Sequence, residues 1–323
     1  MRVLRTLLAS AGLAVVARVA LAQGAAAPSP GAGIPPNIDS AFTWRALSDL
    51  AADSMEGRRM GTRGNAAARA YLVRRLAQAG VLPLVTGYVQ HFDVAWRDTS
   101  VRDGVNVLGI VPGADTTRII VVSAHFDHLG VRHGQIYNGA DDNASGTAAA
   151  LALAEWYAKH PPRHSIVFAF FDGEEADLRG SRAFMLMPPV PLKRIAANVN
   201  IDMVARLDRH TLYAAGATPY PFFRPLLRAT AKVAPVRLRM GHDRTEPNGV
   251  DSWIGQSDHA SFHAMGIPFV YFGVEDHSDY HRITDDVERV DAGRFIAAVR
   301  TIADFVYRLD QSLESVVPSR RGR

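Results

Sequence analysis

The sequence predicts an α/β fold with a mostly parallel central sheet flanked by helices. Short apolar runs typical of buried strands alternate along the chain with longer segments typical of helices. With 323 residues, 48% of them hydrophobic and 21% charged, the chain is long and apolar enough for one large domain. No internal repeat and no second linker interrupts this order.

Four segments carry helix signals. The first is amphipathic and precedes Gly80, a common stop, and the second is rich in Ala and Leu, with Ser145 as its candidate cap. The predicted helices are Asn65–Gln78, Gly146–Lys159, Ser181–Met187 and about Asp291–Leu309.

Five apolar runs are predicted to be strands, because each is short and continuous and each is followed by polar or turn-forming residues. They are Val105–Val111, Ile119–Ser123, Ile166–Phe171, Ala196–Ile201 and Pro268–Phe272.

The N-terminus resembles a secretory signal peptide over residues 1–22. Arg2 and Arg5 precede an apolar stretch at residues 7–17, and a small-x-small cleavage pattern follows at residues 20–22. The apolar stretch is shorter than the roughly 20 residues that span a bilayer, although an uncleaved N-terminal anchor is the alternative. We therefore expect an exported protein, periplasmic or secreted, with no stable membrane insertion after cleavage.

The rest of the chain divides simply. Residues 23–40, rich in Ala, Pro and Gly, are predicted to be a flexible linker, residues 41–310 a single domain, and residues 311–323 a disordered basic tail. The sequence does not determine the oligomeric state.

Net charge and cysteine content exclude several classes of function. The formal charge is +4 and the pI about 9.5, but six arginines at the two ends account for more than the whole excess, so no nucleic-acid partner is predicted. With zero cysteines the chain has no disulfide and no thiolate nucleophile. A metal site must use His, Asp and Glu, which suits zinc, manganese or cobalt.

Metal-binding residue types follow four of the predicted strands. Open α/β sheets bind ligands outside the carboxyl ends of their strands, so these side chains are expected to converge. They are His125 and Asp127, Glu174 and Glu175, Asp202, and lastly His277, Asp279 and His281. An acidic, turn-rich loop at Gly139–Gly146 adds a fifth contribution.

Each of these residues also has a purely structural interpretation. His125 alone could be a hydrogen-bonded core histidine, Asp141–Asn143 a turn or helix cap, and Glu174-Glu175 a solvated loop. Adjacent carboxylates nevertheless repel each other unless a positive charge lies beside them. The complete set also meets the needs of a two-metal site, which are a bridging carboxylate, further ligands for each ion and a free base.

In its ordered motifs the chain resembles the M28 family of zinc aminopeptidases, from about Phe42 to Leu309. The matching segments are Leu50–Gly61, His125-Phe126-Asp127, Gly139–Gly146, Phe171–Glu175, Asn200–Met203, Ser257-Asp258-His259 with Gly266-Ile267-Pro268, and Tyr280–Asp285. The resemblance implies the zinc-dependent exopeptidase architecture for residues 41–310.

The resemblance also implies two Zn²⁺ ions, with Mn²⁺ or Co²⁺ as possible substitutes. His125 and Asp202 would hold one ion, and Glu175 and His281 the other. Asp142 would bridge them, and its neighbour Asp141 is the alternative bridge.

Further roles follow from the same motifs. Glu174 would be the general base and acid, taking a proton from the attacking water and delivering it to the leaving amine. Asp127 would orient His125, and Asp285 would orient His281. The Tyr280 hydroxyl would steady the tetrahedral oxyanion.

The leading functional prediction is an aminopeptidase acting on peptides with a free N-terminus. Glutaminyl cyclases share the fold but use one zinc. A carboxypeptidase or dipeptidase would need an arginine for the substrate carboxylate, for which Arg179, Arg206 and Arg282 are candidates. A non-catalytic binding module would have lost ligands, whereas this chain retains the full set.

Overall fold

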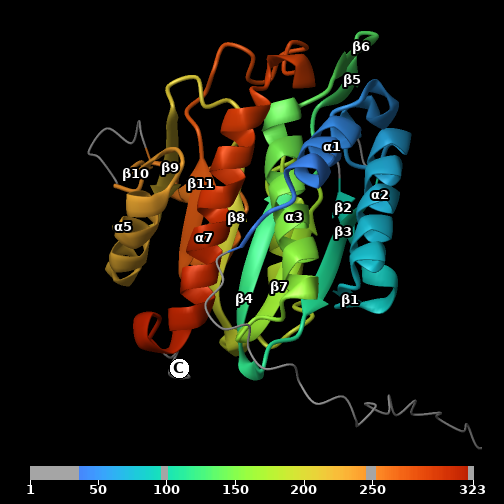
Figure 1. Ribbon diagram of the computed structural model, residues 1–323. Coiled ribbons are helices and arrows are strands. Elements are labelled where there is room, and N and C mark those ends of the chain that lie inside the picture. Colours follow the sequence, from blue (N-terminus) through green and yellow to red (C-terminus); the bar gives the residue numbers. More distant parts are fainter. Residues whose placement is uncertain (1–35, 96–100, 245–251, 319–323) are drawn as a thin grey trace, which may run out of the picture.

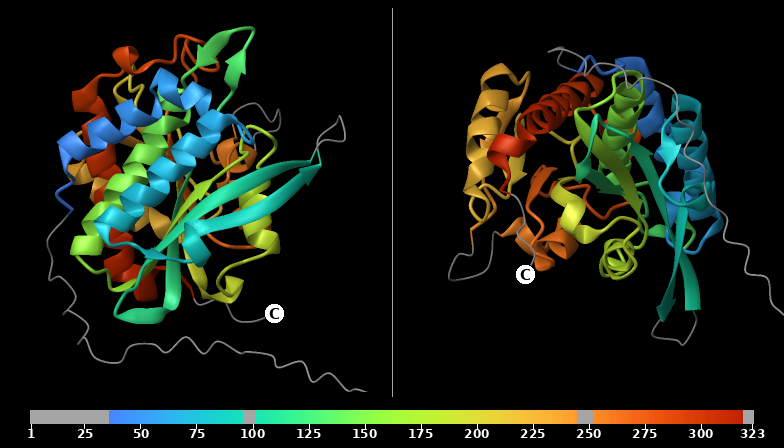
Figure 2. Two further views of the ribbon diagram at one scale, coloured as in Figure 1. Left: turned by 90° about the vertical axis from the view of Figure 1, so that its right-hand side faces the viewer. Right: turned by 90° about the horizontal axis from the view of Figure 1, so that it is seen from below.

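The computed structural model describes residues 36–95, 101–244 and 252–318, and shows a sheet covered by helices on both faces (Figure 1). Helices α1, α2, α3 and α7 cover one face, and α4 and α6 lie on the other, as the view from below shows (Figure 2). The helices are α1 (Ser40–Leu50), α2 (Arg63–Ala79), α3 (Gly146–Lys159), α4 (Arg179–Leu186), α5 (Arg224–Val233), α6 (His259–Ala264) and α7 (Ala292–Val316).

The main sheet has nine strands, eight of them in the order β1-β3-β7-β4-β8-β11-β9-β10, with β2 paired to β3. Its strands are β1 (Leu82–Pro83), β2 (Val89–Ala95), β3 (Val101–Val111), β4 (Asp115–His125), β7 (His164–Phe171), β8 (Ile195–Ile201), β9 (Thr211–Ala215), β10 (Arg237–Met240) and β11 (Phe269–Gly273). A separate hairpin consists of β5 (Gly130–Arg132) and β6 (Gln135–Tyr137).

The centre of the sheet is parallel and its flanks are mixed. β7, β4, β8 and β11 pair in parallel, whereas β3 joins β7 and β9 joins β11 antiparallel. The predicted α/β class is therefore confirmed, and the parallel arrangement holds for the four strands that are buried between helices. Every residue of β7 and β8 is buried, as expected for strands covered on both faces.

Of the two helix-end signals that the sequence predicts, Gly80 is confirmed and Ser145 is not. Thr62 accepts a hydrogen bond from the Asn65 amide at the start of α2, and Gly80 ends the helix with φ 82°. The predicted cap of α3, Ser145, instead donates through its hydroxyl to the Asp141 carbonyl. The Asn143 side chain accepts from the Gly146 amide at 2.8 Å and takes that capping role.

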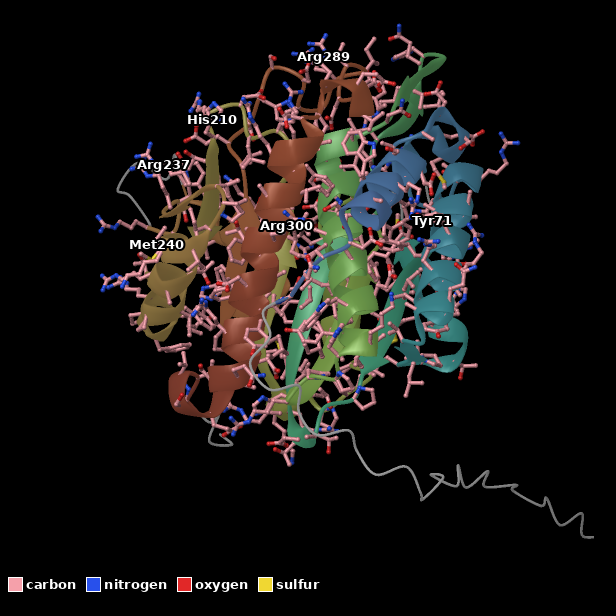
Figure 3. All side chains as sticks on the ribbon, in the orientation of Figure 1. Tyr71, His210, Arg237, Met240, Arg289 and Arg300 are labelled. Atoms are coloured by element: carbon pink, nitrogen blue, oxygen red, sulfur yellow. The ribbon has the colours of Figure 1, made fainter. Side chains whose placement is uncertain are left out.

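Both ends of the predicted domain contain more helix than expected. Helix α1 begins at Ser40, the last residue of the predicted linker, because Asp39 caps it and its apolar residues pack into the core. Helix α7 continues to Val316, so residues 311–316 belong to the helix rather than to a disordered tail, and Leu313 and Val317 are buried. Arg300 of α7, which is labelled in Figure 3, donates to the Ser40 hydroxyl and so joins the two helices.

The predicted signal peptide lies outside the described residues, as do residues 23–35 of the linker. In the parts of the chain that the structure describes, no helix combines the length and the apolar character needed to cross a membrane.

Candidate metal centre

The predicted metal-binding side chains meet at the carboxyl edge of the four central strands. His125 is the last residue of β4, Glu174 and Glu175 follow β7, Asp202 follows β8, and His281 lies in the loop after β11. Because these strands are adjacent and parallel, their carboxyl ends lie at the same edge of the sheet. This edge lies at the top of Figure 1, near the β5–β6 hairpin.

One group of ligand atoms forms around His125. Its Nε2 lies 3.1 Å from Asp202 Oδ1 and 3.5 Å from Asp142 Oδ1. All three residues are buried, and one ligand atom from each lies within 4.8 Å of the others. One imidazole and two carboxylates at this spacing can hold a divalent metal ion.

A second group forms on the other side of Asp142. Asp142 Oδ2 lies 3.1 Å from His281 Nε2, and Glu175 Oε2 lies 3.4 Å from the same nitrogen. The two oxygens of Asp142 therefore face different histidines, His125 and His281, which is the arrangement that a bridging carboxylate requires.

His128 also belongs to the second group, and the sequence analysis missed it. Its Nδ1 lies 2.7 Å from Glu175 Oε1 and 3.5 Å from Asp142 Oδ2. The ring is buried, and within the described residues nothing hydrogen-bonds its Nε2. The available signal was its position three residues after His125, at the same strand end.

Asp141 does not take the place of the bridging carboxylate in this structure, and Asp285 forms no hydrogen bond or ion pair with His281. Asp141 turns away from the two groups and accepts from the Ala205 amide at 2.6 Å, while its other oxygen lies 3.1 Å from His277 Nε2. Asp285 does not orient His281 in this structure. Its carboxylate accepts from the Asp141 and Asp142 amides at 3.0–3.1 Å and so fixes the loop that carries Asp142.

Glu174 lies beside the first group. Its Oε2 is 4.0 Å from His125 Nε2, and its amide donates to Asp127 Oδ1. Burial raises the pKa of Glu174 well above its usual value, and the neighbouring Asp202 charge adds to this rise. A carboxyl group with a raised pKa can both accept and return a proton near neutral pH.

Asp127 and Tyr280 flank the two groups. The backbone carbonyl of Asp127 lies 3.2 Å from His125 Nδ1, and its carboxylate Oδ1 lies 3.7 Å from that nitrogen. The Tyr280 ring stacks on His281 with centroids 3.9 Å apart. Burial, and then the charge of Asp142, raises the Tyr280 pKa, so its hydroxyl stays protonated and able to donate.

The charges of the cluster fit divalent cations. Burial raises the pKa of Asp142, with the Glu175 charge adding to it, because two carboxylates share a small buried volume. Hydrogen bonds to Asp142 and Glu175 raise the pKa of His281 to about 10. This accumulation of buried negative charge is stabilised when cations lie between the carboxylates, and the donor set of imidazole and carboxylate suits zinc.

Comparison with known proteins identifies the family. The sequence model of peptidase family M28 matches residues 106–306, more than half of the chain. The chain belongs to peptidase family M28. A probable leucine aminopeptidase of Arthroderma otae is 27% identical over 248 residues, covering 71% of this chain and 63% of the relative. The chain thus spans less than two-thirds of that relative's length.

Solved structures share the fold. A zinc aminopeptidase from Bacillus subtilis superposes with a TM-score of 0.71 at 16% identity, covering 88% of this chain and 98% of that one. A glutaminyl cyclase from Bacteroides thetaiotaomicron gives 0.68 at 18% identity, covering 85% and 99%. The M28 match confirms the predicted metallo-exopeptidase family, and the structural matches confirm the exopeptidase fold.

A buried arginine holds the loops of this M28 site together. Arg58 is fully buried and donates to the carbonyls of Leu50, Phe126, Asn138 and Gly139 at 2.6–2.9 Å. These carbonyls belong to segments flanking His125 and Asp142. Burial lowers the pKa of Arg58 to about 10, yet the group remains cationic at neutral pH and faces the negative cluster.

We expect Arg58→Met to destabilise the fold by about 3–5 kcal/mol, because it removes four hydrogen bonds and leaves buried carbonyls without a donor. Urea unfolding would measure the change in the free energy of unfolding. Arg63→Met is the matched control, since Arg63 is 88% exposed and its pairing with Glu56 lies at the surface. Equal stability of the two variants would contradict the structural role of Arg58.

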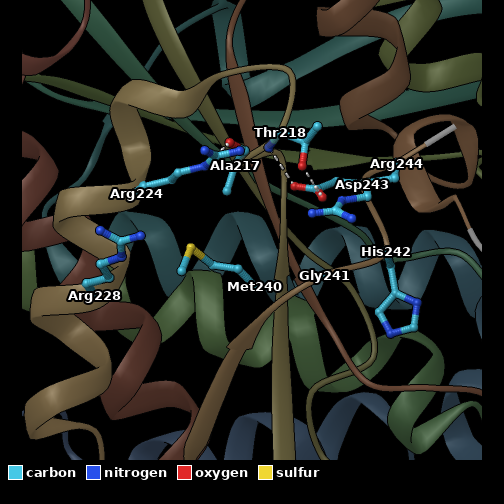
Figure 4. Close-up of a pocket in the computed structure, with 9 residues that line it drawn as sticks. All are labelled: Ala217, Thr218, Arg224, Arg228, Met240, Gly241, His242, Asp243 and Arg244. Atoms are coloured by element: carbon cyan, nitrogen blue, oxygen red, sulfur yellow. Dashed lines mark hydrogen bonds between the residues drawn. The ribbon is translucent and has the colours of Figure 1, made fainter.

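One small cavity adjoins the metal centre, and a larger cavity lies away from it. One of about 90 Å³ adjoins the second group and is lined by Met60, His128, Leu129, Glu175 and Ala176 among others. A larger one of about 380 Å³ lies between α5 and β10 and contains none of the predicted site residues (Figure 4). Its lining includes Arg224, Arg228 and Asp243, and Asp243 accepts from the Thr218 amide and hydroxyl.

Proposed function

We propose that this M28 protein is a dinuclear zinc aminopeptidase that hydrolyses the N-terminal residue from peptides, with Glu174 as general base. One observation carries the proposal: the carboxylate of Asp142 is shared between two groups of ligand atoms, while Glu174 lies beside them and belongs to neither. A shared acid with an adjacent free acid is the arrangement that two-metal hydrolysis requires.

In this proposal His125 and Asp202 would hold one ion, and Glu175 with His281 would hold the other. Asp142 lies between them, and His128 is positioned to join the second set. Bound zinc would supply Lewis acidity, which lowers the pKa of water and polarises the substrate carbonyl. Manganese or cobalt fits the same donors.

The chain's own groups perform the proton transfers and the positioning. Glu174 takes the proton of the attacking water and returns it to the departing amine, for which its raised pKa is suited. Asp127 contacts His125 through its carbonyl and the Glu174 amide through its carboxylate. These two contacts hold the proposed base, Glu174, at a fixed distance from the proposed ligand, His125. The protonated Tyr280 hydroxyl can donate to the oxyanion that forms during amide hydrolysis.

The geometry favours an aminopeptidase over the alternatives. A cyclase with one zinc does not need a second group of ligand atoms, whereas Glu175 and His281 supply one beside Asp142 here. A carboxypeptidase needs an arginine for the substrate carboxylate, but Arg206 pairs with Asp208 and Asp279, and Arg179 donates from Nε to the Ala176 carbonyl. Arg282, the third candidate, is exposed and stays available to a substrate carboxylate, so product analysis must separate the two activities.

We also propose that the substrates are peptides with a free N-terminus, and that the protein is exported to the periplasm or the medium. The relatives named as aminopeptidases support the first statement, and the basic and apolar pattern of residues 1–22 supports the second.

The test is product analysis by mass spectrometry with one peptide in free and N-acetylated form. We expect stepwise loss of N-terminal residues from the free peptide only, and loss of this activity after chelation. Cleavage of the acetylated peptide from its other end would identify a carboxypeptidase instead. If neither peptide is cleaved but N-terminal glutamine is cyclised, the protein is a cyclase.

A further inference from the structure

A second cluster of metal-binding residue types lies at the opposite edge of the sheet. Asp115 begins β4, His164 begins β7, and Glu314 lies in the last turns of α7. One ligand atom from each lies within 4.8 Å of the others. His164 and Phe171 are seven residues apart along β7, which is ~23 Å at ~3.3 Å per residue, so this cluster is separate from the M28 centre. In Figure 1 this is the lower edge, where α7 ends.

The histidine of this cluster is buried and lacks a hydrogen-bond partner on one side. His164 is 0% exposed, and its Nδ1 lies 3.0 Å from the Asp310 carbonyl. That acceptor holds the ring proton on Nδ1 and leaves Nε2 with its lone pair, the form in which histidine binds metals. Among the residues that the structure describes, no group meets hydrogen-bond geometry at Nε2, although Glu314 Oε1 lies 3.2 Å from it.

The two carboxylates present one free oxygen each to this nitrogen. Glu314 Oε1 lies 3.2 Å from His164 Nε2, while its Oε2 lies 3.3 Å from Arg118 Nη1. Asp115 Oδ2 lies 3.9 Å from Nε2, while its Oδ1 accepts from the Thr117 amide and hydroxyl at 2.7 Å. Outer partners therefore orient both acids, as they do around protein-bound metals.

We propose that Asp115, His164 and Glu314 form a third metal site, taking a divalent transition ion of the zinc class. Ligand atoms ~2.0–2.1 Å from a tetrahedral ion are about 3.3 Å apart. The distance from His164 Nε2 to Glu314 Oε1, 3.2 Å, is close to this value. The distance to Asp115 Oδ2, 3.9 Å, would have to shorten by about 0.6 Å on metal binding. Asp115 and Glu314 are partly exposed, which leaves the remaining coordination positions open to water. The ion would tie the end of α7 to the starts of β4 and β7.

The competing state is a protonated His164 paired with the acids and no metal. Burial lowers the pKa of His164, but the hydrogen bond to Asp310 and its charge outweigh burial and raise it. Arg118 is the other cation facing the cluster, through Glu314. The two states differ in metal content, which an experiment can measure directly.

The test compares zinc content by elemental analysis after chelation of the full-length protein and dialysis against micromolar Zn²⁺. We expect Glu314→Gln and Asp115→Asn each to bind one equivalent less than the wild type. Glu288→Gln, the same change at an exposed glutamate elsewhere on the surface, should keep the wild-type content. Equal content in all four proteins would overturn the third site and establish the ion pair.

A second measurement separates this site from the M28 centre. In an Asp142→Asn background, Cu²⁺ should still bind and give an electron paramagnetic resonance signal with nitrogen coupling from one imidazole. Adding Glu314→Gln should remove that signal. A signal unchanged by Glu314→Gln would overturn the site, whatever the outcome at the M28 centre.

Discussion

Replacing Glu174 by Gln should lower turnover on the order of 10²–10⁴-fold while leaving both metal sites intact. The amide has nearly the shape of the carboxyl group but cannot accept the proton of the attacking water or return it to the leaving amine. Glu174 lies outside both groups of ligand atoms, with Oε2 4.0 Å from His125 Nε2, so metal binding should not change. Peptide hydrolysis rates and elemental analysis of the same sample would measure the two effects.

Glu175→Gln provides the matched control for this experiment, because it makes the same chemical change one residue later. Glu175 contacts both His128 and His281, so its amide variant should lose metal as well as activity. A fully metallated Glu174→Gln protein with unchanged turnover would show that another group is the base. Loss of metal from Glu174→Gln would show that it is a ligand.

The position of the site could be predicted because two simple rules coincide. Apolar strands such as Ile166–Phe171 are visible in the sequence, and parallel strands deliver the residues after them to one edge. The structure accordingly brings His125, Glu175 and Asp202 to that edge, and Asp142 reaches it through the loop before α3.

Loop geometry limited what else could be inferred. His128 lies beyond the end of β4, where no strand period fixes the direction of a side chain, and Asp285 supports backbone amides instead of an imidazole. Arg58 belongs to a residue type that is almost never fully buried unless paired, so composition gives no sign of its interior position. Helix α7 extends past its predicted end because Leu313 in its last turns is buried, as is Val317 directly after the helix.

Asp142→Asn should remove the metals, in contrast to Glu174→Gln. Each oxygen of Asp142 faces a different group of ligands, so the change weakens both sites at once. Loss of an outer hydrogen-bonding partner costs roughly 10–100-fold in metal affinity, and loss of a shared ligand should cost more. Elemental analysis after dialysis would show the loss, and peptide hydrolysis should fall with it.

The neighbouring acid makes this prediction specific. Asp141→Asn alters a buried carboxylate that accepts from the Ala205 amide and the Ser145 hydroxyl and contacts His277, so it should cost about 1–3 kcal/mol of stability. It should nevertheless keep the metals of the M28 centre, because neither group of ligand atoms includes it. If Asp141→Asn loses metal while Asp142→Asn retains it, the bridge is Asp141 and the two roles must be exchanged. Retention by both would mean that the ions do not share a carboxylate from this loop, and a single bound zinc would then become the better description.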